Sequence, residues 1–141
     1  MSWLKRKSVL IPIDFSELSY QALGPAKEHV EDISALKVIH VLAPLHPADP
    51  AAMWDTVSDD DRKQKVREFT QGKLSEMGYD GIHIEVVIGD TTSKIVDYAQ
   101  EIDADLIVMP SHGRKGVSRF LLGSVAESIV RLSHCPVLIL K

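Results

Sequence analysis

The stretch LIVMPSHGRKGVSRFLLGS, from Leu106 to Ser124, decides how this chain is expected to fold. It begins with four consecutive apolar residues, the pattern of a strand that is buried on both faces of a sheet. It continues through glycine-containing turns and three basic residues, and then enters a segment with helical spacing. Free backbone N–H groups and the helix dipole meet at such a helix start, so the stretch predicts an anion site, preferably for phosphate.

Four further apolar runs of strand length occur along the chain: Val9 to Ile13, Leu36 to Leu42, Ile82 to Ile88 and Pro136 to Leu140. The third of these alternates apolar and polar residues, so we expect it at an edge of the sheet with one face partly wet. The others are nearly continuous apolar runs, which is typical of strands that helices cover on both faces.

Segments with helical spacing separate the strands, and we expect helices after Ser16, Ser58, Thr92 and Ser124. Gly24-Pro25 lies inside the first of these patterns and should kink or interrupt that helix. The alternation of strands and helices predicts one α/β domain over residues 1–141. Its sheet should be parallel, with right-handed crossovers and helices on both faces.

Two helix starts carry polar residues with a structural interpretation. Ser124 and Glu127 stand in the S-x-x-E relation of a capping box, which leaves open whether Ser124 also binds a ligand. Asp59, Asp60 and Asp61 fall in the first turn of the second helix, where the dipole favours negative charge. We interpret this triplet as a solvated helix start and not as a metal site.

The composition excludes several classes of protein. The 141 residues are 45% hydrophobic and 26% charged, with a net charge of -4, and they lack the basic surplus of a nucleic-acid-binding protein. Cys135 is the only cysteine, which excludes an intramolecular disulfide and suits a reducing compartment such as the cytoplasm. No apolar run approaches the roughly 18 residues that a membrane span needs, so we expect no membrane partner.

Asp14 places a carboxylate at the same edge of the sheet as the Leu106 to Ser124 turn, because it follows the first strand directly. It could bond a ribose hydroxyl or hold a Mg²⁺ ion that bridges phosphates. It could also be only a turn acid ahead of the first helix. The residues leave both interpretations open.

Several features that occur together in one family are present: the opening VLIPIDFS from Val9 to Ser16, the turn Gly89-Asp90, the pattern G-x9-G-S from Gly113 to Ser124, and the final strand CPVLI from Cys135. With them, nearly the whole chain resembles the universal stress protein family. The resemblance implies a five-stranded, Rossmann-like sheet in the order 3-2-1-4-5, of the adenine nucleotide alpha hydrolase-like type. It also implies a cytoplasmic homodimer that pairs through Pro136 to Leu140, an apolar run at a sheet edge.

In one branch of that family the resemblance implies bound ATP, or possibly AMP or ADP, with Mg²⁺. The implied site residues lie on the first, second and fourth strands and at the start of the last helix: Pro12, Ile13, Asp14, Val41, Met109, Ser111, His112, Gly113, Gly123, Ser124 and Val125. Arg114, Lys115 and Arg119 are further cations that could neutralise phosphate charge or be solvated surface groups.

One departure from the family pattern matters. Pro110 stands where the motif G-x2-G-x9-G-S/T has its first glycine. Proline has no N–H, so it should remove one possible donor and add ring atoms where the backbone approaches the ligand. Nucleotide affinity should therefore be weakened.

Three functions stay open from the sequence. The first is a stress-response protein in which nucleotide occupancy alters the loop at 43–56 and so the surface shown to partners. The second is a dimeric interaction module of the same fold without nucleotide, and the third is a slow ATP hydrolase. No P-loop, nucleophile elbow or candidate base is present, so the sequence does not identify an enzyme.

Overall fold

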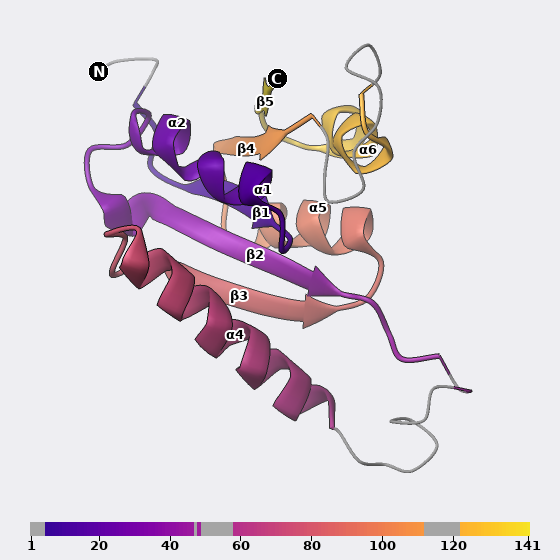
Figure 1. The fold of residues 1–141 in the computed structure, drawn as a ribbon. Helices are drawn as coiled ribbons and strands as arrows, with labels where there is room; N and C mark the ends of the chain where they lie inside the picture. The colour runs from indigo at the N-terminus through magenta and orange to yellow at the C-terminus, as the bar shows by residue number, and fades with distance from the viewer. Residues whose placement is uncertain (1–4, 47, 49–57, 112–121) are drawn as a thin grey trace.

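The computed structural model describes residues 5–46, 48, 58–111 and 122–141. Five parallel strands form one sheet in the order β3-β2-β1-β4-β5, as expected from the sequence (Figure 1). Their bounds are β1 Val9–Ile13, β2 Leu36–Leu42, β3 His83–Ile88, β4 Leu106–Pro110 and β5 Val137–Leu140. The alternating strand, β3, lies at one edge, and β5 lies at the other.

Helices cover both faces of this sheet (Figure 1). Their bounds are α1 Glu17–Gln21, α2 Leu23–Lys27, α4 Asp59–Glu76, α5 Thr91–Glu101 and α6 Ser124–Leu132, and a 3-10 turn, η1, spans Ile33–Ala35. Helices α1, α2 and α4 pack on one face, and α5 and α6 pack on the other. The structure therefore confirms the predicted α/β fold class.

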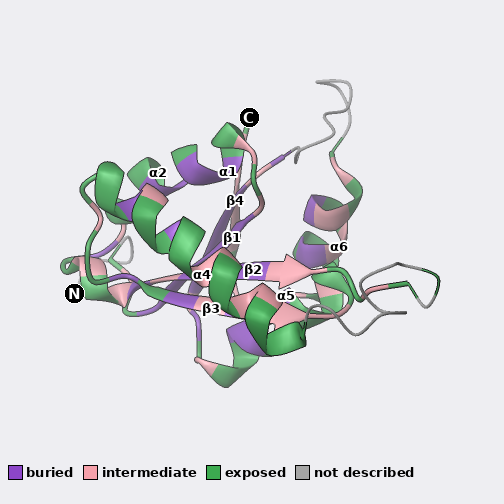
Figure 2. Ribbon diagram, turned by 60° about the horizontal axis from the view of Figure 1, so that its bottom comes forward, coloured by how far each residue is buried: buried purple, intermediate pink, exposed green. Residues whose placement is uncertain are grey.

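The core is divided into two apolar clusters, one on each side of the sheet. Val9 and Ile11 of β1 face the first cluster, whereas Leu10 between them faces the second. All five residues of β1 are buried, and exposed residues gather on the outer sides of the helices (Figure 2). This burial on both faces explains why the central strands are continuous apolar runs.

The first helical segment is interrupted, as expected from Gly24-Pro25. Helix α1 ends at Gln21, Ala22 separates it from α2, and Gly24 and Pro25 lie inside the first turn of α2. Pro25 has no N–H with which to continue the hydrogen bonds of α1, but a proline in the first turn of a new helix needs no helical acceptor. The interruption therefore falls before the proline.

Two helix starts show how caps set their bounds. The Ser58 hydroxyl accepts the Asp61 N–H at 3.0 Å, which confirms a helix after Ser58 and places the aspartate triplet in its first turn. The expected start after Thr92 is wrong, because α5 begins at Thr91. Asp90 caps this helix by accepting the Ser93 N–H at 3.0 Å, and the bond lowers the pKa of Asp90.

Neighbouring residues of α6 provide a test of this packing. Ile129 is fully buried against the sheet, and Val130 is 49% exposed. We expect Ile129→Ala to lower the free energy of unfolding by about 2–5 kcal/mol, because it leaves a cavity in the core. Val130→Ala should change it by no more than about 0.5 kcal/mol. Urea unfolding of both variants measures the difference, and equal losses would contradict the assignment of the buried face.

Candidate functional site

The strand order of the sheet reverses between β1 and β4, the place where open α/β sheets form a ligand-binding crevice. β1 pairs with β2 along its whole length, from Val9 to Ile13. Its pairing with β4 covers only Val9 and Leu10, opposite Leu106 and Ile107. The two strands therefore separate toward their carboxyl ends, the place where open α/β sheets bind ligands.

Pro110 is one cause of this separation. The N–H groups of Ile107 and Ser111 donate to the carbonyls of Pro136 and Leu140 on the β5 side, at 3.0 and 2.8 Å. Backbone groups of successive residues in a parallel strand face alternate neighbours. The position of Pro110, directly before Ser111, therefore faces β1, and proline has no N–H to donate there.

Pro12 has the same effect from the other side. The carbonyl of Ser8 accepts the Asp105 N–H at 2.9 Å, so Leu10 and Pro12 are the residues of β1 whose backbone faces β4. Two prolines thus meet across the gap, and neither can extend the ladder. The donor that Pro110 removes, as expected from the sequence, is one that would have pointed toward β1.

Ser111 connects the crevice to the last helix. Its carbonyl accepts the N–H of Gly123 at 2.8 Å, while its own N–H is held by Leu140. These bonds bring together Ser111, Gly123 and Ser124, three of the expected site residues. His112 and Gly113 lie outside the described residues, as do the candidate cations Arg114, Lys115 and Arg119.

The start of α6 corrects the expected capping box. The N-cap is Gly123, whose carbonyl accepts the Glu127 N–H at 2.9 Å, and Ser124 is already the first helical residue. No side chain of the described residues caps this helix, and the Glu127 carboxylate pairs with Arg131 at 2.7 Å. Within the described part of the chain, the first-turn amides from Ser124 to Ala126 therefore have no side-chain acceptor, and such amides favour an anion.

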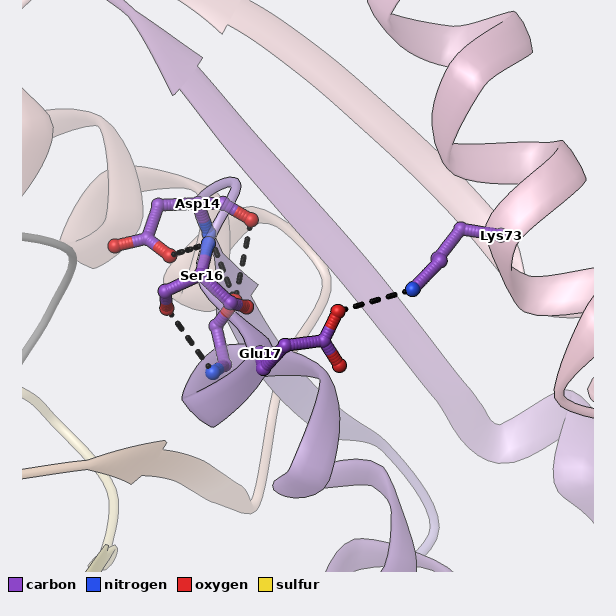
Figure 3. A network of polar contacts seen from close by, with 5 residues as sticks. Asp14, Ser16, Glu17 and Lys73 are labelled. Carbon is purple, nitrogen blue, oxygen red and sulfur yellow. Dashed lines mark hydrogen bonds and ion pairs between the residues drawn. The ribbon is translucent and has the colours of Figure 1, made fainter.

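Asp14 is held at the other side of the crevice, where the chain enters α1. Its Oδ1 accepts the Ser16 N–H at 2.7 Å, and the Ser19 hydroxyl donates to its backbone carbonyl at 3.1 Å. Figure 3 shows the Asp14 carboxylate and the Glu17 side chain pointing in opposite directions, with Glu17 reaching Lys73 of α4 at 3.0 Å. Asp14 therefore is a turn acid, and that role fixes its half-buried carboxylate in place.

The remaining expected residues divide between the two faces of the sheet. Met109 belongs to the apolar cluster beneath α5 and α6, and the partly buried Val41 and Val125 pack against that cluster. Ile13 is buried in the opposite cluster, so its side chain lies on the far face of the sheet from Met109. The structure thus assembles an apolar wall beside the α6 start, to which Ile13 contributes no side chain.

The residues present fit a metal ion only in part. Among the described residues, no group of three or more histidine, cysteine, aspartate or glutamate side chains is placed to hold one. Asp14 is thus a single carboxylate near the crevice. A Mg²⁺ ion at this place would need most of its oxygen ligands from a bound phosphate compound and from water, the usual arrangement for this ion.

His40 is a feature of this region that the sequence analysis missed. It lies on β2 with only 4% of its surface exposed, and its ring centroid is 4.6 Å from that of Phe15. Burial lowers the pKa of His40, and the nearby Asp14 carboxylate opposes that shift without reversing it. The imidazole is therefore neutral at neutral pH, one residue from Val41.

Comparison with known proteins identifies the family of this chain. The model of the universal stress protein family matches residues 5–141. The chain belongs to this family. Universal stress protein MJ0531 of Methanocaldococcus jannaschii is 34% identical to it over 141 residues, which cover 96% of this chain and 82% of that protein.

Solved structures of similar proteins have the same fold. Protein MJ0577 from Methanocaldococcus jannaschii superimposes on this universal stress protein with a TM-score of 0.69 at 29% identity, over 96% of this chain and 95% of that one. A universal stress protein solved in complex with cAMP gives a TM-score of 0.65 at 24% identity, over 96% and 97% of the two chains. Within the described residues, no helix has both the length and the apolar character needed to cross a membrane.

The buried state of His40 predicts a loss of stability in mild acid. The unfolded chain takes up a proton near pH 6.5, whereas the folded protein resists protonation to a lower pH. Stability should therefore fall as the pH drops below about 6.5, until the lowered pKa is passed. Thermal melts at several pH values should show a smaller acid-induced fall in Tm for His40→Leu than for the wild type. His83→Gln, at an exposed histidine, should keep the wild-type profile, and an unchanged profile for His40→Leu would contradict this account.

Proposed function

We propose that this universal stress protein binds an adenine nucleotide in the crevice between β1 and β4, with the phosphates at the start of α6. ATP is the proposed ligand, with AMP or ADP as related ones. Occupancy alters the surface that the protein shows to a partner in a stress response. The observation that carries the proposal is the uncapped helix start at Gly123, which lies beside the separated strand ends.

In this proposal, backbone amides bind the phosphates of the nucleotide. The N–H of Gly123 already donates to the carbonyl of Ser111. The donors available to a phosphate are therefore the amides of Ser124, Val125 and Ala126. These belong to a helix of nine residues, whose dipole adds to the attraction for an anion. The Ser124 hydroxyl does not cap the helix and is a further donor at the same place.

In this proposal, the ribose and the base contact residues on both sides of the crevice. Asp14 supplies an acceptor for a ribose hydroxyl, held in orientation by the Ser16 amide. Val41 and Met109 supply an apolar wall on the α5 and α6 face, suited to the plane of a base. The phosphates of the bound nucleotide would supply most of the negative charge that balances Mg²⁺. Asp14 is the protein carboxylate that we propose as a ligand of the ion, because no cluster of ligating side chains is present among the described residues.

A universal stress protein of the same fold was solved in complex with cAMP. The protein solved with cAMP shares the fold at 24% identity, so that likeness concerns the fold alone. The contacts named above therefore carry the proposal for this chain. They include no group that orients an attacking water, and the proposed action is conformational, without turnover of the nucleotide.

A homodimer paired through β5 is the second part of the proposal. The β5 strand is half-buried along its length and lies at the edge of the sheet. Leu132 of the adjoining α6 is a large apolar residue that is 58% exposed. A two-fold partner would cover both features at once. We also propose that the dimer works in the cytoplasm, in agreement with its single cysteine.

Substitutions of Ser124 test the phosphate cradle. Ser124→Pro removes one amide donor at the first helical position, where proline is best tolerated. A bond to a charged group contributes about 1.5–3 kcal/mol, so we expect a loss of about tenfold to a hundredfold in affinity for Mg-ATP by calorimetry. Ser124→Ala, which keeps the amide, should lose less. Thr91→Pro, at the first position of α5, is the matched control and should bind as the wild type does.

A measurement of nucleotide binding by the wild-type protein distinguishes the nucleotide-binding function from the nucleotide-free interaction module. Absence of heat and of any Tm shift with millimolar Mg-ATP or AMP in the wild-type protein would contradict nucleotide binding. It would favour the nucleotide-free interaction module, because Pro110 at the crevice mouth would then be the obstacle.

A proline in β5 tests the dimer. The carbonyls of Pro136 and Leu140 face β4, so the backbone of Ile139 faces outward. Ile139→Pro therefore removes an edge donor and spares the β4 ladder. We expect the protein to sediment as a monomer with unchanged far-UV circular dichroism, whereas a variant that stays dimeric would contradict pairing through this strand.

A further inference from the structure

Three buried polar side chains lie under α4 without a hydrogen-bond partner among the described residues. They are the Tyr20 hydroxyl on α1, the His40 Nδ1 on β2 and the Thr70 hydroxyl on α4. Tyr20 and His40 are 3% and 4% exposed, and Thr70 is fully buried. Tyr20 and Thr70 belong to helices on one side of the sheet, and His40 faces that side because Val38 and Leu42, two residues away on the same strand, do so.

Their mutual contacts place them in one seam. The Thr70 hydroxyl is near enough to Tyr20 to lower the pKa of its phenol, although burial raises that pKa more strongly. The two hydroxyls nevertheless lack the geometry of a direct hydrogen bond. The Phe15 ring contacts His40 at 4.6 Å and Phe69, the neighbour of Thr70, at 5.7 Å between centroids. The Asp14 charge acts on both Tyr20 and His40.

Elsewhere α4 is held by few buried contacts. Only Thr70 and Leu74 of its residues are buried, with Val66 packed partly against the same cluster. Two contacts of Lys73 link α4 to α1: its ion pair with Glu17, whose side chain is 74% exposed, and its Nζ lying 5.7 Å from the ring centroid of Tyr20. An exposed ion pair contributes little to stability, so α4 is held mainly by the packing of Leu74 and Thr70 against the sheet.

We propose that ordered water molecules fill this seam and bridge the Tyr20 and Thr70 hydroxyls and the His40 imidazole. Buried polar groups in proteins are almost always satisfied, and hydroxyls that face each other beyond bonding geometry are typical neighbours of a bridging water. The two hydroxyls can each donate and accept a hydrogen bond, and the imidazole nitrogen can do one or the other. The three groups therefore supply the two to four partners that an internal water requires. The seam lies on the α1 and α4 face of the sheet, whereas the apolar wall proposed for the nucleotide base lies on the α5 and α6 face.

A consequence follows for the motion of α4. A helix attached to its sheet through water and few apolar side chains opens more readily than one attached through a continuous apolar stripe. The opposite face provides that comparison, because α5 buries Ile95, Tyr98 and Ala99 in one stripe. The amides of α4 should therefore exchange with solvent before those of α5.

A crystal structure of the wild-type protein at a resolution that shows water tests the site directly. We expect an ordered water within about 3 Å of the Thr70 hydroxyl and of either Tyr20 Oη or His40 Nδ1. A direct bond between the Tyr20 and Thr70 hydroxyls in a dry seam would overturn the proposal.

The hydrogen-exchange rate of α4 amides in the variant Thr70→Val is an independent test of the bridging water. If the hydroxyl anchors water, its removal leaves the other groups unsatisfied, and α4 amides should exchange about tenfold faster or more while α6 stays unchanged. If the hydroxyl is unpaired in a dry seam, the same change slows exchange and raises Tm. Equal or slower exchange in α4 would therefore overturn the proposal. Thr91→Val, at an exposed threonine, is the matched control.

Discussion

The site depends on one constraint in the sheet: the backbone of β1 and β4 cannot stay paired to their ends. Pro12 and Pro110 occupy the positions whose N–H groups would cross the gap, so the ladder stops after Leu10 and Ile107. A parallel sheet that reverses its strand order already leaves space at this point. The prolines ensure that the space is not closed by further pairing.

The same part of the chain links the crevice to the edge of the sheet. Ser111 is bonded on one side to Leu140 of β5 and on the other side to Gly123 at the start of α6. The position of the helix start is thus set by a strand that we propose as the dimer contact. On the other side of the crevice, Ser16 and Ser19 hold Asp14 through short local bonds, so the two sides are fixed by different elements.

Local patterns predicted the strands well, because a strand that is buried on both faces has a continuous apolar sequence. The order of the strands came from the family resemblance and not from these patterns. Helix starts were harder, since a cap depends on which residue closes the first turn. Asp90 took that role instead of Thr92, and Gly123 took it instead of Ser124. The burial of His40 could not be predicted from a single polar residue in an apolar strand. The direction faced by Pro110 could not be predicted either, because it follows from the strand register.

The amides of Ser124, Val125 and Ala126 are the groups on which the nucleotide proposal depends, and two-dimensional ¹H–¹⁵N NMR observes each of them. Titration with Mg-ATP should shift these three signals in a saturable way, while the first-turn amides of α5 keep their positions. Signals at α6 that stay in place at millimolar nucleotide would contradict the account.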